Sequence, residues 1–262
     1  MKIAISGKGG VGKTSIAALL AKFLHRAGYR VLAVDADPDA NLAATLGFPH
    51  ASDIVPMVEM KELIEERMGA KLGGFGALFK LNPKVDDLPA KYCFEHDGIR
   101  LMVMGQIRKG GSGCFCPENA FVRRLLAHLL MEEKDVLIVD MEAGIEHLTR
   151  GTSEAVDVLI VVVEPGMRSI ETAYKVRDLA ADLGIQTVLG VANKVRGAKD
   201  RAFILDRMQD IQVIGFIPYS EEILMGNMGD QGIDMKEIVE GPVGKAMKEI
   251  QAEIEKAVDH RT

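Results

Sequence analysis

The residues with the most specific chemistry lie in a glycine-rich segment near the start of the chain. The segment follows a short apolar run, opens a helical stretch, and reads Gly7-Lys8-Gly9-Gly10-Val11-Gly12-Lys13-Thr14-Ser15. Its spacing, G-x-x-x-x-G-K-[ST], is typical of a phosphate-binding loop, whose glycines let backbone N–H groups turn toward phosphate oxygens. We expect Lys13 to reach the β- and γ-phosphates of a nucleotide and the Thr14 hydroxyl to bind Mg²⁺. The alternative, a tight turn without a ligand, is disfavoured by the four glycines and two lysines.

Carboxylates follow two of the predicted strands. Asp140 ends the apolar run VLIVD, and the run RVLAVD leads into Asp35-Ala36-Asp37-Pro38-Asp39-Ala40-Asn41. The carboxyl ends of parallel strands form the crevice in which doubly wound folds bind ligands. Asp140 therefore has the position of a carboxylate that holds Mg²⁺ through water. Asp39 and Asn41 have a second interpretation, since both residue types cap helices.

The residues after Asp140 are predicted to respond to the nucleotide. They read Met141-Glu142-Ala143-Gly144-Ile145-Glu146-His147. Gly144 could swing when contacts to a γ-phosphate change. His147 is a metal ligand, a switch group or a polar surface residue, and for a lone histidine the last is the commonest case.

Two cysteines lie in a second glycine-rich stretch, which reads Gly110-Gly111-Ser112-Gly113-Cys114-Phe115-Cys116-Pro117. Thiols this close in sequence do not easily form a disulfide, but both can ligate one soft or borderline metal ion. Two further ligands would come from solvent, another residue or a second chain; two copies of the loop about a two-fold axis would give four sulfurs. An incidental pair is the alternative, although a polar loop is not a core setting. Cys93 is interpreted as a small packing residue.

Strand and helix patterns alternate along the chain and predict an α/β fold. Nearly continuous apolar runs predict strands over 2–6, 30–35, 136–140, 158–164, 187–193 and 212–218. Such runs are typical of parallel strands covered on both faces, here by helices predicted over 13–27, 118–132, 168–183 and 243–258. We therefore expect a doubly wound, mostly parallel sheet with helices on both faces.

The alternation is interrupted between about residues 48 and 98. This part contains an amphipathic helical pattern over 57–68 and glycine- and proline-containing pieces, and a further strand is predicted over 99–105. We interpret residues 48–98 as an insertion at one edge of the sheet. No linker divides the chain, so residues 1–262 are predicted to form a single domain.

Composition narrows the classes of partner. The chain has 262 residues and a net charge of -6. A negative net charge disfavours electrostatic attraction between the protein as a whole and nucleic acid. No apolar run is long enough to cross a bilayer, and MKIAIS leads directly into the phosphate-binding loop, which argues against an export signal. Three cysteines argue against a disulfide framework. We expect a cytoplasmic protein that binds neither nucleic acid nor membrane.

Three stretches together resemble a known family. An ordinary phosphate-binding loop does not require Lys8, and GKGGVGKTS resembles the deviant Walker A loop of the MinD/ParA/ArsA/nitrogenase-iron-protein group of ATPases. With that loop, GGSGCFCPENAFVRRLLAHLL and VDMEAGIEHLTRGT are similar to the CooC-type nickel-insertion ATPases of carbon monoxide dehydrogenase maturation. A sister group, which serves acetyl-CoA synthase maturation, shares these features. The matching stretches span nearly the whole chain, except residues 57–92.

The resemblance implies roles for residues around the nucleotide. Lys8 would cross a dimer interface to the partner's nucleotide, and Asp37 would orient the attacking water with support from Asp35 and Asp39. Asn193 would recognise adenine. Pro218 would contact the base from the loop after the last strand.

The resemblance also implies a cargo and a client. Cys114 and Cys116 of two chains would together hold Ni²⁺, although thiolate pairs bind Zn²⁺ as readily. The protein would be a homodimeric ATPase that uses ATP and Mg²⁺ and delivers nickel to carbon monoxide dehydrogenase or acetyl-CoA synthase.

Two alternative functions stay open. The first is a MinD- or ParA-like positioning ATPase that acts on membrane or DNA, but the tail MKEIQAEIEKAVDHRT lacks the bulky aromatics of a membrane anchor. The second is an iron–sulfur carrier, for which a C-x-C pair is less suited than widely separated cysteines.

Overall fold

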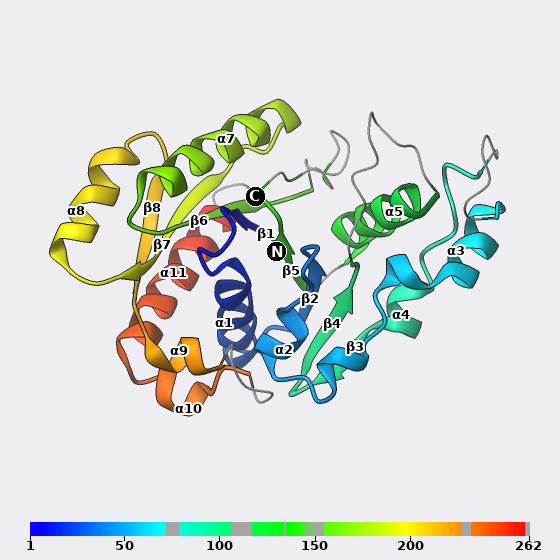
Figure 1. The fold of residues 1–262 in the computed structure, drawn as a ribbon, viewed down its shortest axis with the longest axis horizontal. Coiled ribbons are helices and arrows are strands. Elements are labelled where there is room, and N and C mark those ends of the chain that lie inside the picture. Colours follow the sequence, from blue (N-terminus) through cyan, green and yellow to red (C-terminus); the bar gives the residue numbers. More distant parts are fainter. Residues whose placement is uncertain are drawn as a thin grey trace.

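The computed structural model describes residues 1–71, 79–105, 117–133, 135–143, 145, 148, 155–226 and 232–259. Within these residues, eight strands form one sheet in the order β3-β4-β2-β5-β1-β6-β7-β8 (Figure 1). The strands are β1 (Lys2–Gly7), β2 (Val31–Ala36), β3 (Phe94–His96), β4 (Ile99–Val103), β5 (Val136–Met141), β6 (Val158–Val163), β7 (Val188–Val195) and β8 (Gln212–Pro218).

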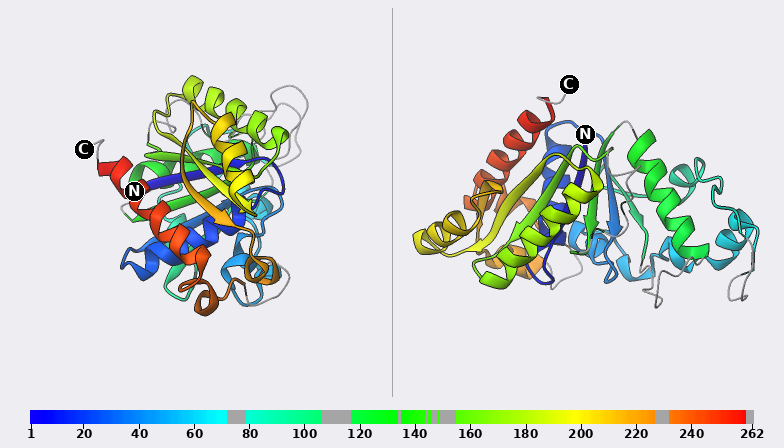
Figure 2. Two further views of the ribbon diagram at one scale, coloured as in Figure 1. Left: turned by 90° about the vertical axis from the view of Figure 1, so that its left-hand side faces the viewer. Right: turned by 90° about the horizontal axis from the view of Figure 1, so that it is seen from above.

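Helices cover both faces of this sheet (Figures 1 and 2). On one face, α1, α2 and α11 pack in one apolar core; on the other, α3, α4, α5, α7 and α8 pack in a second. The longer helices are α1 (Lys13–Arg26), α3 (Lys61–Met68), α5 (Pro117–Glu132), α7 (Met167–Leu183), α8 (Ala198–Arg207) and α11 (Pro242–Asp259). The shorter ones are α2 (Leu42–Leu46), α4 (Leu88–Tyr92), α9 (Glu221–Gly226), α10 (Met235–Ile238) and the 3₁₀ turns η1 (Ala51–Asp53) and η2 (Met57–Glu59).

The central strands are apolar at successive positions because both of their faces are covered. Every residue of β2, β5 and β6 is buried. In β1, Ile3 and Ile5 belong to the core beneath α1, whereas Ala4 between them belongs to the core on the other face. Side chains that alternate across a strand thus tie both helix layers to the sheet. The parallel pairings and the two covered faces confirm the predicted fold class.

The region predicted as an insertion forms one end of the sheet, next to β4. Its antiparallel strand β3 was not predicted, and the turn that joins β3 to β4 has positive φ at both Asp97 (48°) and Gly98 (74°). An Asp-Gly pair favours such a tight hairpin turn.

Two predicted boundaries in this region are wrong. The helix predicted over 57–68 begins only at Lys61, because the backbone N–H of Val58 donates to Met104 O (3.0 Å) rather than joining a helical turn. The strand predicted over 99–105 ends at Val103, and Gly105 has a positive φ of 81° that leaves the extended region. Within the described residues, no helix has the length and apolar character needed to cross a bilayer.

Candidate functional site

The glycine-rich loop connects the end of β1 to the start of α1, as its spacing predicts. Gly10 and Gly12 have positive φ values of 81° and 95°, which side chains rarely allow. A Cβ on Gly12 would lie 2.3 Å from Asn193 Nδ2, and a Cβ on Gly7 would lie 2.5 Å from the carbonyl oxygen of Val162. Glycine is therefore required at both positions by contact with the rest of the fold.

Residues at the end of β7 hold the loop in this shape. Asn193 is 4% exposed, and its Nδ2 donates to the carbonyl oxygen of Val11 (2.8 Å). The ammonium of Lys194, a residue with a φ of 58°, donates to the carbonyl oxygen of Gly10 and to Glu164 Oε2 (3.0 Å). No role was predicted for Lys194 or Glu164, and the only sequence signal for Lys194 is its place beside Asn193 at the end of a predicted strand. The role of Asn193 toward adenine stays a prediction.

Lys13 and Asp37, which were predicted to act on the phosphates and the attacking water, form an ion pair. Lys13 Nζ lies 3.3 Å from Asp37 Oδ2, and the two side chains are 8% and 14% exposed. A lysine committed to a carboxylate cannot at the same time bind phosphate fully. The ion pair therefore keeps both side chains beside the loop. It also engages the positive charge of Lys13, which would otherwise be free to bind a nucleotide phosphate.

Asp35 and Asp140 lie side by side at the carboxyl ends of β2 and β5, where the strand register pairs them. Both are fully buried. Burial, with a smaller contribution from the charge of Asp35, raises the pKa of Asp140 to about 8, although the Thr14 hydroxyl and Lys13 act in the opposite direction. Burial likewise raises the pKa of Asp35 to about 7. The folded protein therefore binds protons here that ordinary carboxyls would have lost.

Asp35 also fixes the start of α2. Its Oδ2 accepts from the backbone N–H of Leu42 (2.8 Å), and its Oδ1 accepts from that of Asp37 (3.2 Å). The alternative that Asn41 caps this helix through its side chain is wrong, because Asn41 makes no such hydrogen bond. Asp35 can cap from a distance since β2 ends directly beneath the first turn of α2.

The donor set fits a magnesium ion brought in by a nucleotide. Neither carboxylate oxygen of Asp140 has a partner at full hydrogen-bond geometry among the described residues, although the Thr14 hydroxyl is near enough to lower its pKa. In phosphate sites Mg²⁺ is bound by oxygen atoms. A buried, unpaired carboxylate next to a threonine hydroxyl supplies ligands of this kind. No cluster of three or more His, Cys, Asp or Glu residues that could hold a metal by themselves occurs in the part of the chain described here.

For the remaining predicted site residues, the structure gives at most a position, which does not test the predicted role. Lys8 is partly buried, Ser15 is 5% exposed at the start of α1, and Pro218 ends β8. Cys114, Cys116, Gly144 and His147 lie outside the described residues. Cys93 is a partly buried free cysteine packed against the core, and burial raises its pKa to about 11. An unreactive thiol of this kind agrees with the packing role predicted for it.

Comparison with known proteins extends this description. A family model described as the CobQ/CobB/MinD/ParA nucleotide binding domain matches residues 2–228. The carbon monoxide dehydrogenase accessory protein CooC of Rhodospirillum rubrum is 50% identical over 225 residues, 85% of each chain. An uncharacterized ATP-binding protein of Methanocaldococcus jannaschii is 44% identical over 254 residues, 96% of this chain and 95% of that protein.

Solved structures agree on the fold. The septum site-determining protein MinD from Pyrococcus horikoshii, complexed with Mg-ADP, matches with a TM-score of 0.68 at 19% identity, covering 100% of this chain and 98% of that chain. MinD in the MinC:MinD complex of Aquifex aeolicus matches with a TM-score of 0.69 at 19% identity, covering 98% and 96%. With its phosphate-binding loop and paired strand-end carboxylates in place, the chain belongs to the CobQ/CobB/MinD/ParA nucleotide-binding family, in the branch that contains the CooC-type ATPases.

Proposed function

We propose that this chain is an ATP-hydrolysing metallochaperone that dimerises and delivers nickel to a carbon monoxide dehydrogenase or an acetyl-CoA synthase during maturation of the metal centre. The observation that carries the proposal is the 50% identity, over 85% of both chains, to a carbon monoxide dehydrogenase accessory protein. The nucleotide site supports the ATPase half, since Asp37 pairs with Lys13 of the loop, and Lys13 and Thr14 both act on Asp140.

The first event of the cycle is a change of partner for Lys13. The γ-phosphate of ATP competes with Asp37, whose Oδ2 lies 3.3 Å from Nζ of Lys13, for the Lys13 ammonium. Asp37 is thereby released to orient the attacking water. The same movement that completes phosphate binding thus supplies the residue that hydrolysis needs.

Thr14 and Asp140 would hold the Mg²⁺ that arrives with ATP, and the ion would neutralise charge on the β- and γ-phosphates. Asp140 must lose its proton to take this role, and the ammonium of Lys13 favours its ionised form. Lys8 of each chain would reach the phosphates bound by the partner and stabilise the charge that develops there.

The cargo site is linked to the nucleotide site by a short path in the chain. Cys116 immediately precedes Pro117, the first residue of α5, and α5 leads into β5, which carries Asp140. A helix start lowers the pKa of nearby thiols, which favours the thiolates that bind nickel. We infer that a change at Asp140 on hydrolysis is passed along β5 and α5 to the cysteine pair, which then releases the ion.

Metal analysis tests the cargo half. With ATP and Mg²⁺, we expect the wild-type protein and a C93A control to retain about one Ni²⁺ per two chains, and a C114A/C116A variant to retain none. All three should bind nucleotide equally. Stoichiometric nickel in the double variant would refute a cysteine-held cargo.

The dimer half is tested by the mass in solution. ATP should bring the wild-type protein and a K199A control, altered on the exposed face of α8, to the mass of two chains. A K8A variant should remain a single chain and lose hydrolysis. A K8A protein that dimerises and hydrolyses ATP normally would contradict the role of Lys8.

The positioning-ATPase alternative gains no support from the last helix. The apolar side chains of α11, among them Met247, Ile250 and Ile254, are buried in the core with α1 and the sheet. They are therefore already used in folding. ATP-dependent co-sedimentation with liposomes or DNA would nevertheless favour that alternative over metal delivery.

A further inference from the structure

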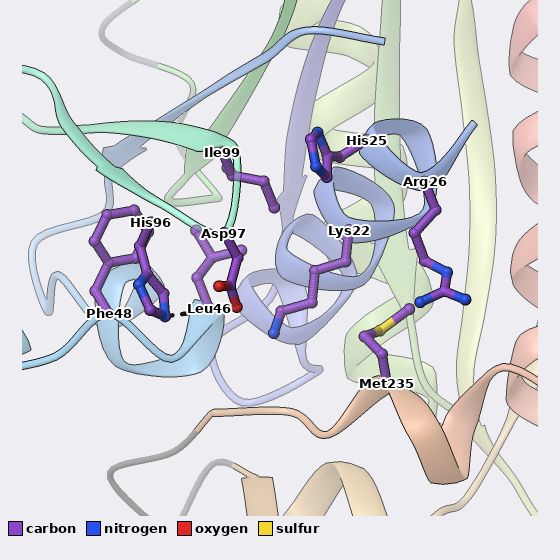
Figure 3. Close-up of a pocket in the computed structure, with 9 residues that line it drawn as sticks. All are labelled: Lys22, His25, Arg26, Leu46, Phe48, His96, Asp97, Ile99 and Met235. Carbon is purple, nitrogen blue, oxygen red and sulfur yellow. Dashed lines mark ion pairs between the residues drawn. The ribbon is translucent and has the colours of Figure 1, made fainter. Parts of the chain in front are cut away.

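A pocket lies at the C-terminal end of α1, whereas the phosphate-binding loop lies at the start of this helix. Its volume is about 350 Å³, within the range of small-molecule sites. The last two turns of α1 form one wall, the β3–β4 turn a second, and Met235 at the start of α10 a third (Figure 3). Since α1 begins at the phosphate-binding loop and ends here, one helix separates this pocket from the nucleotide.

Cations dominate the polar part of the lining. Lys22 and Arg26 extend from α1 toward Asp97 and Met235 (Figure 3). Asp97 is the single carboxylate that lines the pocket among the described residues, and Asp234 acts on Lys22 from outside the lining. The lining itself thus carries two cations and one anion, although the chain as a whole has a net charge of -6. An incoming anion would be attracted to this end of α1.

Two of the polar groups lack full compensation. Burial lowers the pKa of Lys22, and Asp97 and Asp234 only partly oppose the effect. Lys22 Nζ donates to the carbonyl oxygen of Ile233 (3.1 Å), which leaves further donor capacity on the ammonium. Nδ1 of His25 is buried without a hydrogen-bond partner among the described residues. A ligand with oxygen acceptors would satisfy groups that the fold has desolvated.

The remaining lining is apolar. Leu46, Phe48, Ile99 and Met235 surround the polar groups. The Phe48 and His96 rings lie 5.4 Å apart between centroids and are tilted by 55°, so that they form an aromatic corner. Such a corner suits a flat or aliphatic body better than a fully hydrated ion.

We propose that this pocket binds a small organic anion, one that carries a carboxylate or phosphate head and an apolar body. The head contacts Lys22 and Arg26, and the body lies against Phe48 and Met235. The proposal is independent of the nickel cargo and of dimerisation, because none of these residues belongs to the nucleotide site or to the cysteine loop.

Calorimetric titration with four probes tests the ligand class. Phenyl phosphate and benzoate carry both parts, benzyl alcohol lacks the charge, and inorganic phosphate lacks the body. Saturating Mg·ADP is present throughout, so that the phosphate-binding loop is occupied. We expect phenyl phosphate or benzoate, or both, to bind with a Kd of about 1 mM or tighter, and about tenfold tighter than the two incomplete probes.

Variants locate the binding. R26Q removes an exposed cation without touching the core, and M235W fills the pocket without changing its charge. The first should weaken binding about tenfold and the second should abolish it, while R124Q, the same change on the exposed face of α5, should have no effect. Circular dichroism confirms that each variant is folded.

Three results would overturn the proposal. They are equal binding of benzyl alcohol, unchanged binding in both R26Q and M235W, or the absence of binding by both organic anions at millimolar concentration. A difference between phenyl phosphate and benzoate would identify the preferred head group within a supported proposal.

Discussion

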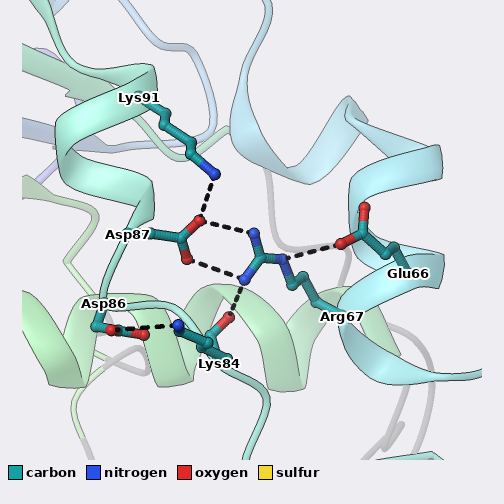
Figure 4. Close-up of polar contacts among 6 residues, drawn as sticks. All are labelled: Glu66, Arg67, Lys84, Asp86, Asp87 and Lys91. Atoms are coloured by element: carbon teal, nitrogen blue, oxygen red, sulfur yellow. Dashed lines mark hydrogen bonds and ion pairs between the residues drawn. The ribbon is translucent and has the colours of Figure 1, made fainter.

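Asp140 and Asp87 are both aspartates, but their environments in the fold shift their pKa values in opposite directions. Asp140, at the end of β5, is fully buried, and its oxygens have no partner at full hydrogen-bond geometry in the described part of the chain. Asp87, just before α4, binds both guanidinium nitrogens of Arg67 (2.9 and 2.8 Å) and the ammonium of Lys91 (2.7 Å) (Figure 4). Burial raises the pKa of Asp140, whereas its cationic partners hold the pKa of Asp87 well below its usual range.

This difference indicates that Asp140 is placed to bind a ligand, whereas Asp87 stabilises the fold. A carboxylate with satisfied oxygens stabilises the fold by itself, because a bidentate arginine fixes its geometry. A carboxylate left buried and unpaired destabilises the empty protein, and natural chains keep such a group where a ligand compensates it. The region of β3, α3 and α4 contains the first kind, and the ends of β2 and β5 contain the second.

The largest effect is expected from D140N. Removing the carboxylate that would hold Mg²⁺ should reduce ATP hydrolysis by about 10²- to 10³-fold in a steady-state assay. The nucleotide-free variant should be more stable at pH 8, by about 5 °C in Tm, because a buried charge is gone. A variant that is less stable and still active would remove Asp140 from the site.

The pH dependence of stability sharpens the same contrast. Between about pH 4 and 8, folded Asp140 holds a proton that the unfolded chain has lost, so the free energy of unfolding decreases as pH rises. This decline should be shallower in D140N, measured by urea unfolding without nucleotide. Mg²⁺ and ADP should also flatten it in the wild-type protein, because they bind the ionised form. A wild-type protein whose stability is constant over this range would contradict the buried, protonated state.

D37N should have a smaller effect, and it should change the rate of hydrolysis and the affinity for ATP in opposite directions. Loss of the water-orienting carboxylate should slow hydrolysis about 100-fold. ATP should nevertheless bind several-fold tighter, since Lys13 no longer has a competing partner at 3.3 Å. Fluorescent-nucleotide titration gives the affinity, and D182N, the same change at an exposed position of α7, is the matched control. Weaker ATP binding in D37N would show that the ion pair supports the loop rather than competing for it.

Loss of a contact that supports the phosphate-binding loop should weaken nucleotide binding more than it slows ATP hydrolysis. N193A deletes the hydrogen bond to the carbonyl oxygen of Val11 and leaves that buried acceptor unpaired. We expect nucleotide affinity to fall about tenfold, with a smaller change in kcat. Comparison of ATP with GTP separates the two roles of Asn193. An equal loss for both nucleotides indicates loop support, and a loss confined to ATP indicates contact with adenine.

The smallest effect is expected from D87N, in the scaffold region. Breaking a pair that is partly exposed should lower Tm by at most about 3 °C at pH 7 and leave ATP hydrolysis unchanged. Because the folded pKa of Asp87 is depressed, its contribution is present above about pH 4 and is lost as the solution becomes more acidic. Both D87N and D140N should therefore resemble the wild-type protein more closely in acid, whereas at neutral to weakly basic pH D87N should be less stable and D140N more stable than the wild-type protein. A large loss of activity would assign this region to the site.

The sequence predicted the parts that depend on local pattern. Continuous apolar runs located the central strands, and spacing alone identified Lys13 and Asp140. The hairpin of β3 and β4 had a local signal, the Asp97-Gly98 pair, but β3 itself is only three residues long. The late start of α3 was missed because it depends on a tertiary contact, that of Val58 with Met104. For the same reason the hydrogen bond from Asn193 to Val11, which spans 182 positions, could not be predicted from periodicity.

The anchoring of the phosphate-binding loop has a consequence for successive rounds of turnover. Residues of β7 donate hydrogen bonds to the carbonyl groups of Gly10 and Val11, and these contacts are made entirely within the chain. The entropy of ordering the loop is therefore lost when the chain folds and is not lost again each time ATP arrives. After ADP departs, the same contacts keep the loop ready for the next nucleotide.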